Sequence, residues 1–339
     1  MGNTDDMTCA PVYQARTRRI TRVGLVIVAL FFISLVTSCA NLARVRDESI
    51  PKLLEPRAAG DLPTLLAKLE PFGNLQALRA SRFFIQFIDA ESSDKYRTAD
   101  GALVLQRPDK IRLIVQVPFA GTRIAEMVSE SNRFKVAIYP DSYRRFLIGT
   151  NNADYSRWRA QLSNKNQSAL VNARPFHFTE ALMTRPLETS NPRFAYSLEE
   201  ELVEEPDTRP EAKKKARVLR SFYVVSEVEL ATTPGGASRM RRRFWFDRSD
   251  NLTFARQQIF DERGDLSTEV QYSQYMKLSD SNPHLWPSVV LVARPHDNYS
   301  ARLTFNQGRF EINPTDLAPT VFALENTEGL PVTDLDLNP

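Results

Sequence analysis

The stretch from Arg16 to Cys39 constrains this chain more than any other part of the sequence. Arginines at positions 16, 18, 19 and 22 come first, and a run without charged residues extends from Val23 to Leu42. The apolar core from Val23 to Val36 is 14 residues long, which suits the h-region of a bacterial export signal. The whole uncharged run of 20 residues is also just long enough to cross a bilayer as an uncleaved anchor. Either interpretation places the rest of the chain outside the cytoplasm.

The end of this run favours cleavage. Val36, Thr37, Ser38 and Cys39 are an aliphatic residue, two small residues and a cysteine, and small side chains let a peptidase approach the backbone closely. The pattern resembles the lipobox of bacterial lipoproteins, whose cysteine is diacylated and becomes the mature N-terminus. The resemblance implies a signal peptide over residues 1–38, cleavage between Ser38 and Cys39, and a diacylglycerol and palmitate-type lipid on Cys39.

The residues after Cys39 bear on where the protein is held. Ala40, not Asp, follows the cysteine. By resemblance to lipoprotein sorting in Gram-negative bacteria, this implies the outer membrane, with the domain facing the periplasm. Residues 39–60 then carry mixed charge and two prolines, a composition that predicts a tether between the lipid and a folded domain.

Composition bounds the mature domain. Its share of the 339 residues is enough for one large or two small domains. The formal net charge of +3 includes the arginines of the signal, and a nearly neutral domain argues against nucleic acid as a partner. The two cysteines are Cys9 and Cys39, so the mature domain has no disulfide and must be stable through its core.

Two regions of period-2 alternation dominate the mature chain, over residues 80–149 and 218–312. Ile111, Leu113 and Val115, for example, alternate with more polar neighbours. Short polar turns join such segments, which predicts consecutive antiparallel strands. We expect a mainly β fold with a few helices (α+β). Its roughly ten to twelve strands should curl into a sandwich or a wide, partly open barrel.

Two short helices are predicted beside the strands. Leucines at positions 62, 65, 66 and 69 form one apolar stripe. Asp61 is suited to cap the N-terminus of this helix, and Pro71 predicts its end. A second helix is predicted over residues 176–183. Both are expected to pack on the sheet, with docking to a partner as the alternative for the first.

Two other regions lack such patterns. Glutamates gather over residues 199–205 and lysines over residues 213–215. Opposed charge blocks of this kind predict a charged loop near 199–217, either a solvated hairpin tip or a mobile loop. Residues 326–339 are expected to form a C-terminal tail.

Several segments together resemble a known family. The leucine-rich helix leads through Leu75–Ala80 into the first strand, Arg107–Arg112 links two strands, and Leu285–Leu291 precedes Arg294-Pro295. These segments resemble the LolA/LolB-type lipoprotein carrier superfamily over residues 61–325. The resemblance implies a half-open antiparallel β-barrel that helices close over an apolar cavity. It also implies a function in lipoprotein sorting or outer-membrane maintenance.

Two classes of function remain open. In the first, the domain binds acyl chains or lipoproteins in an apolar cavity, and the candidate lining residues are Leu66, Val115, Phe134, Phe244 and Phe246. Ordinary core packing is the alternative for each of these side chains. In the second class, the barrel is filled and the protein is a non-enzymatic periplasmic scaffold or stress sensor that binds another protein.

Patterns of catalysis and metal binding are absent from the sequence. The three histidines, His177, His284 and His296, are not spaced as ligands on one helix face, and we expect them on the surface or in loops. Nucleophile-elbow, phosphate-loop and dinucleotide fingerprints do not occur. We therefore predict that the protein is not an enzyme and holds no cofactor or metal.

Overall fold

The computed structural model of the chain describes residues 51–89, 98–141, 144–151, 153, 155, 175–207, 209–213, 215–278, 285–297 and 299–337. The chain separates into two compact units, residues 1–51 and 52–339. The predicted signal peptide, the predicted lipidation site Cys39 and His284 lie outside the described residues. The fold of the second unit follows.

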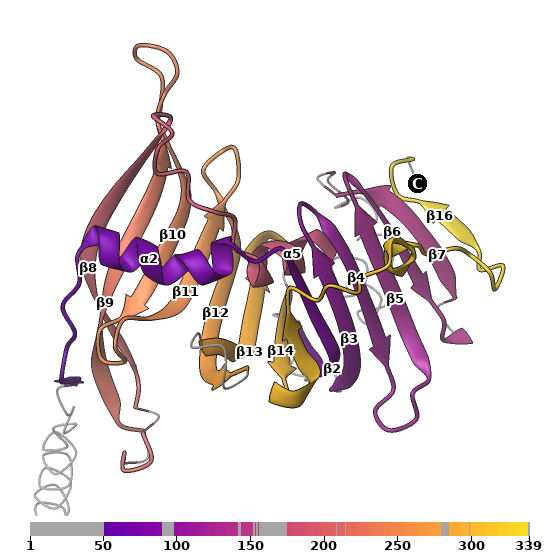
Figure 1. The fold of residues 1–339 in the computed structure, drawn as a ribbon, viewed down its shortest axis with the longest axis horizontal. Helices are drawn as coiled ribbons and strands as arrows, with labels where there is room; N and C mark the ends of the chain where they lie inside the picture. The colour runs from indigo at the N-terminus through magenta and orange to yellow at the C-terminus, as the bar shows by residue number, and fades with distance from the viewer. Residues whose placement is uncertain are drawn as a thin grey trace, which may run out of the picture. The chain divides into compact units, whose positions relative to one another are not determined.

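One sheet of sixteen strands is the framework of the described residues (Figure 1). Its order is β1-β9-β10-β11-β12-β13-β14-β2-β3-β4-β5-β6-β7-β16, with β8 paired to β9 and β15 paired to β2. The strands are β1 (Lys52–Leu53), β2 (Ala77–Asp89), β3 (Ala99–Gln106), β4 (Lys110–Gln116), β5 (Arg123–Glu130), β6 (Arg133–Ile138), β7 (Arg145–Thr150), β8 (Phe194–Pro206), β9 (Arg217–Glu229), β10 (Arg239–Asp247), β11 (Thr253–Phe260), β12 (Leu266–Lys277), β13 (Leu285–Arg294), β14 (Tyr299–Phe305), β15 (Phe310–Ile312) and β16 (Val332–Asp334).

The prediction of a mainly β fold with a few short helices is confirmed, with more strands than expected. The strands outside the two predicted regions are β1 and β16, which have two or three residues each and are too short to show a period, and β8, most of which was predicted as a loop. Neighbouring strands pair antiparallel, except that β1 runs parallel to β9 and β16 runs parallel to β7. Within the described residues no pairing joins the two ends of this order, so the sheet is not closed.

Side chains alternate between two faces, and the register carries each face across many strands. We call the face that the helices cover the inner face and the opposite one the outer face. One inner row consists of Val225, Phe244, Gln257, Val270, Val292 and Ala301. The outer row beside it consists of Val224, Trp245, Arg256, Gln271, Leu291 and Arg302.

Two α-helices, α2 (Leu62–Gly73) and α5 (Pro175–Leu182), lie on the inner face. The prediction that Asp61 caps α2 is confirmed, because its side chain accepts a hydrogen bond from the main-chain nitrogen of Thr64 at 3.0 Å. The prediction that Pro71 ends this helix is wrong by two residues. The helix continues past the proline because Phe72 packs between the aromatic rings of Phe254 and Trp286. The 3₁₀-helices among the described residues are η2 (Pro295–Asp297), η3 (Gln307–Arg309) and η4 (Pro319–Phe322).

The charged region near 199–217 is mostly strand and not loop. Strands β8 and β9 pair from Phe194 opposite Glu229 to Pro206 opposite Arg217, so the strand pair includes residues 199–206 and Arg217 of this region. The glutamates of β8 occupy consecutive positions and so lie on both faces of the strand. Arginines of the neighbouring strand pair with them, as Arg217 does with Glu204. The charge block is therefore the solvated half of a strand pair.

Both ends of the domain belong to the sheet. The predicted tether over residues 39–60 contains β1, and Leu54 beyond it is buried. The predicted C-terminal tail over residues 326–339 contains β16, between the buried residues Leu330 and Leu335. In each segment only two or three residues pair with the sheet. The rest of the segment has the composition of a linker, and this dominates its sequence.

Candidate functional site

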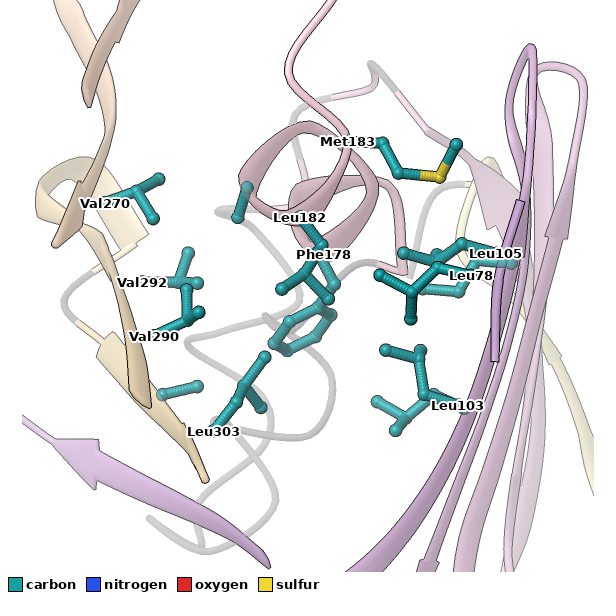
Figure 2. Packing of buried hydrophobic residues seen from close by; sticks show 14 of the residues in the cluster. Leu78, Leu103, Leu105, Phe178, Leu182, Met183, Val270, Val290, Val292 and Leu303 are labelled. Atoms are coloured by element: carbon teal, nitrogen blue, oxygen red, sulfur yellow. The ribbon is translucent and has the colours of Figure 1, made fainter. Parts of the chain in front are cut away.

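Helix α5 occupies the centre of the inner face. Phe178, Leu182 and the following Met183 are almost fully buried. Figure 2 shows these three side chains between two groups of strand residues. The residues on one side are Val270, Val290, Val292 and Leu303, and those on the other side are Leu78, Leu103 and Leu105. The helix is thus enclosed by aliphatic side chains from both halves of the sheet.

The five predicted cavity residues lie in this same core. Val115, Phe134, Phe244 and Phe246 are buried in it, and Leu66 of α2 packs against it half-buried. This placement on one face is what a cavity lining requires, and it is also what an ordinary core requires. That they line a cavity when α5 moves stays a prediction.

Arg107, in the turn after β3, holds the ends of both helices. Its guanidinium donates hydrogen bonds to the main-chain oxygens of Gly73 at 3.1 Å, of Leu75, and of Thr184 at 2.8 Å. These oxygens belong to the end of α2, to the segment after it and to the segment after α5. Burial lowers the pKa of Arg107, but an arginine stays charged in proteins. One cation therefore satisfies carbonyls that helix ends leave without partners.

Two further polar contacts join the end of α5 to β11 and β12. The Tyr272 hydroxyl donates to the main-chain oxygen of Ala181 at 2.8 Å, and Thr184 Oγ1 donates to Gln257 Oε1 at 2.9 Å. Burial raises the pKa of Tyr272, so its hydroxyl stays protonated and can donate. With Arg107, these contacts fasten a helix of eight residues that apolar packing otherwise holds.

A small hollow of about 130 Å³ lies where the chain leaves α5. Two ion pairs line it, Glu180 with Arg185 and Glu227 with Arg242. Because these four charges pair within the protein, the hollow offers no unpaired charge to a ligand from this set. We infer that these two ion pairs hold the segment after α5 in place, since Arg242 also donates a hydrogen bond to the main-chain oxygen of Arg185.

The turn between β4 and β5 displays an aromatic side chain. Phe119 is 95% exposed, and Val117, two residues before it, is also exposed. The φ angle of Phe119 is 64°, in the left-handed region where a bulky residue is uncommon. A single exposed apolar residue is ordinary, but a bulky residue held at positive φ is a reason to look for a function, so this turn is a second candidate functional feature.

The outer face differs between its two halves. Over β4–β7 it is covered by residues 319–335, which we call the C-terminal strap. Phe322 and Leu330 of the strap are buried against residues such as Val128 and Phe146. Over β8–β14 a hollow of about 740 Å³ opens instead, with residues of β8 to β14 in its lining; we call it the outer hollow.

Sequence analysis missed three of these features. The sequence places Arg107 only in a linker between two strands, although an Arg-Pro pair directly after a strand is a signal for an unusual turn. Phe119 had a signal too, as the one aromatic residue in a turn between Pro118 and Gly121. The outer hollow had none, because it depends on which strands are neighbours.

The expectation for the histidines is wrong for one of them. His177 is 2% exposed on α5, because this helix contacts β4, β5 and β13 at once. Within the described ranges, no group of three or more His, Cys, Asp or Glu side chains could hold a metal ion. In the same part of the chain, no helix has the length and apolar character needed to cross a membrane.

Comparison with known proteins gives a likeness in structure and none in sequence. No family model and no curated protein matches the chain. A LolA superfamily protein from Nitrosomonas europaea is 9% identical with a TM-score of 0.41, over 78% of this chain and 99% of that one. A DUF1329 family protein from Desulfovibrio piger is 11% identical with a TM-score of 0.43, over 76% of this chain and 94% of that one. At these values, membership of the LolA/LolB-type superfamily stays a prediction.

Proposed function

We propose that this chain is a lipid-anchored envelope protein that binds an acyl chain, free or as part of a lipoprotein, on its inner face. One observation carries the proposal. The short helix α5 occupies the centre of a continuous apolar face, and Arg107 fastens its end together with that of α2. Withdrawal of α5 would uncover aliphatic residues such as Val290 and Leu103 on either side of it (Figure 2). A surface of this kind fits a methylene chain.

Burial of an acyl chain can supply the free energy needed to release the polar contacts of α5. An acyl chain gains about 0.8 kcal/mol for each buried methylene, so about twelve methylenes contribute about 10 kcal/mol. A hydrogen bond contributes about 1 kcal/mol net, and about 2 kcal/mol where one partner is charged. The polar contacts at the end of α5 thus contribute less than the ligand supplies. The ligand would also replace the apolar packing of Phe178 and Leu182.

Two features support action at a membrane. The lipobox-like Val36–Cys39 predicts a lipid on Cys39, and Phe119 presents an apolar ring that can enter a lipid surface. The proposal includes a location at the outer membrane, facing the periplasm, and no enzymatic activity. Mass spectrometry of the N-terminal peptide of membrane-purified protein tests the anchor. An unmodified Cys39 still joined to residues 1–38 would overturn that part of the proposal.

The acyl site is tested by displacement of a fluorescent fatty acid from residues 52–339, which form a compact unit. We expect palmitate to displace the probe. Arg107→Lys keeps the charge but loses the fork of donors, so both association and dissociation should become about tenfold faster, the effect of about 1.4 kcal/mol. Arg112→Lys is the matched control, because Arg112 donates to the strap on the outer face.

Absence of any acyl binding to the wild-type protein at high micromolar concentration would overturn the acyl site. The alternative function, a non-enzymatic scaffold or stress sensor that binds another protein, would then hold. Equal rates for the wild-type protein and Arg107→Lys would show that Arg107 does not control access to the inner face.

A further inference from the structure

The outer hollow has an apolar floor and a polar border. The floor residues include Phe222, Trp245, Ala255, Val289 and Leu291. Arg256 and Arg302 belong to the outer row that crosses the hollow. A volume of about 740 Å³ lies in the range of sites that take a ligand of several residues or rings.

The C-terminal strap shows how this same face holds a segment of chain, here the 3₁₀-helix η4 and the residue after it. Arg112 of β4 pairs with Glu126 of β5, and its Nη1 donates to the main-chain oxygens of Val321 at 2.7 Å and Ala323 at 3.2 Å. Phe322, between these two residues, is buried against the sheet. An arginine held by a neighbouring glutamate thus binds two carbonyls, and the side chain between them fills an apolar pocket.

The outer hollow contains a similar pair of an arginine and a glutamate on neighbouring strands, but no segment among the described residues covers this pair. Arg256 of β11 donates through Nη2 to Glu269 of β12 at 2.6 Å, and Gln258 donates to the same carboxylate oxygen at 2.9 Å. Among the described residues, Nη1 of Arg256 has no acceptor. The Arg256 guanidinium also lies over the ring of Trp245, 4.7 Å from its centroid, which fixes it at the floor of the hollow.

Charge decides what kind of segment fits. Arg220 of the lining is neutralised by Glu205 and Asp247. Arg302 is exposed and has no ion pair among the described residues. Asp250 precedes β11, three strands away from Arg302 in the order of the sheet. An acidic group is therefore favoured at the β14 side of the hollow.

We propose that the outer hollow binds a polypeptide segment of a partner protein. The main-chain oxygens of this segment accept hydrogen bonds from Arg256, and a large apolar side chain lies on the accessible lining residues Ala255, Leu285 and Leu291. An acidic side chain next to it pairs with Arg302. The site is on the face opposite α5, so it does not depend on the acyl site of the inner face.

Selection of phage-displayed random linear peptides on the full chain in lipid nanodiscs tests this proposal. Enriched peptides should share a large apolar residue close to an Asp or Glu. Synthetic fluorescent copies should bind the wild-type chain and bind Leu291→Glu and Arg302→Glu at least about tenfold more weakly. Arg309→Glu is the matched control, because Arg309 is exposed and outside this hollow. Palmitate should not compete.

Three results would overturn the proposal. The first is that no peptide is enriched over the unselected library. The second is that enriched peptides bind both variants as tightly as the wild-type chain, or are displaced by palmitate. The third is that Arg302→Glu weakens attachment to vesicles of phosphatidylglycerol while no peptide is selected, which would make a lipid surface the partner. Loss of acyl binding with peptide binding intact would affect the proposed acyl function alone.

Discussion

Both halves of the outer face contain an ion pair between neighbouring strands, but only one half covers this pair with another segment of the chain. Each half has an arginine on one strand paired with a glutamate on the next, Arg112 with Glu126 and Arg256 with Glu269. Under the C-terminal strap the Glu126 side chain is 1% exposed, whereas the Glu269 side chain is 19% exposed beside the outer hollow. The sheet is similar in both halves, so the covering segment decides how far water is excluded from the pair.

A charged side chain that a segment covers needs more hydrogen-bond partners than one that keeps contact with water. Glu126 also accepts hydrogen bonds from Arg123 at 3.2 Å and from the Tyr139 hydroxyl at 3.2 Å. A buried carboxylate needs this full set of partners, because removal from water costs several kcal/mol for an ion. Glu269 keeps contact with water and depends less on any single partner. This difference between the covered and the open ion pair can be tested by a substitution in the strap, by substitutions of the two glutamates and by changing the pH.

The largest effect should come from the strap itself. Phe322→Ala removes a buried ring that packs on Val128 and Phe146, so we expect the free energy of unfolding to fall by about 3–4 kcal/mol. Urea denaturation of residues 52–339 measures it. Phe119→Ala is the matched control and should stay within about 0.5 kcal/mol of wild type, because that ring is exposed. Equal losses for both variants would mean that the strap does not stabilise the sheet.

The next effect separates the two glutamates. Glu126→Gln removes the charge from a buried pair and should lower the free energy of unfolding by about 3 kcal/mol. Glu269→Gln acts on a pair open to water and should lower it by about 1 kcal/mol or less. Chemical denaturation of both variants in parallel gives the ratio. A larger loss for Glu269→Gln would contradict the view that the strap sets the difference.

The smallest effect is a pH dependence in the open half. Burial opposes the charge of Glu269, but hydrogen bonds from Gln258 and Arg256 prevail and hold the pKa of this glutamate below its usual value of 4.5. A lowered folded pKa contributes stability above the unfolded pKa, and this contribution is lost as the pH falls through the folded value. Between about pH 5 and 3, stability should therefore fall less steeply in Glu269→Gln than in wild type. Identical slopes would show that Glu269 is not the titrating group.

The sequence predicted the parts of the fold that local patterns encode. Alternation around Ile111 and Val115 identified β4, and Asp61 identified the start of α2, because both signals lie within a few residues. Most of strand β8 was predicted as part of a loop near 199–217, because consecutive glutamates do not alternate with apolar residues as in the other strands. Their arginines lie on β9 and β10, and only the pairing of these strands brings them together.

The apolar residues of the candidate site could be predicted from the sequence, but the hydrogen bonds by which Arg107 holds the two helix ends could not. Phe244 and Phe246 were recognised as inward-facing, because alternation fixes the face of a strand. The role of Arg107 depends on two helix ends more than 100 residues apart in the sequence, which no local pattern reveals. Phe119 differs, since its exposure follows from a turn that the sequence does contain.

The pairing of β14 with β2 has a consequence for how the chain matures. Strands β2–β7 and strands β8–β14 each follow one another in the sequence, so each half can assemble from nearby segments. The seam between them must close a loop that spans most of the domain, and such distant pairings form slowly. Helix α2 likewise precedes β11, on which it packs, by a long stretch of sequence. The arrival of the last third of the chain therefore sets the time during which early apolar surface stays open to aggregation.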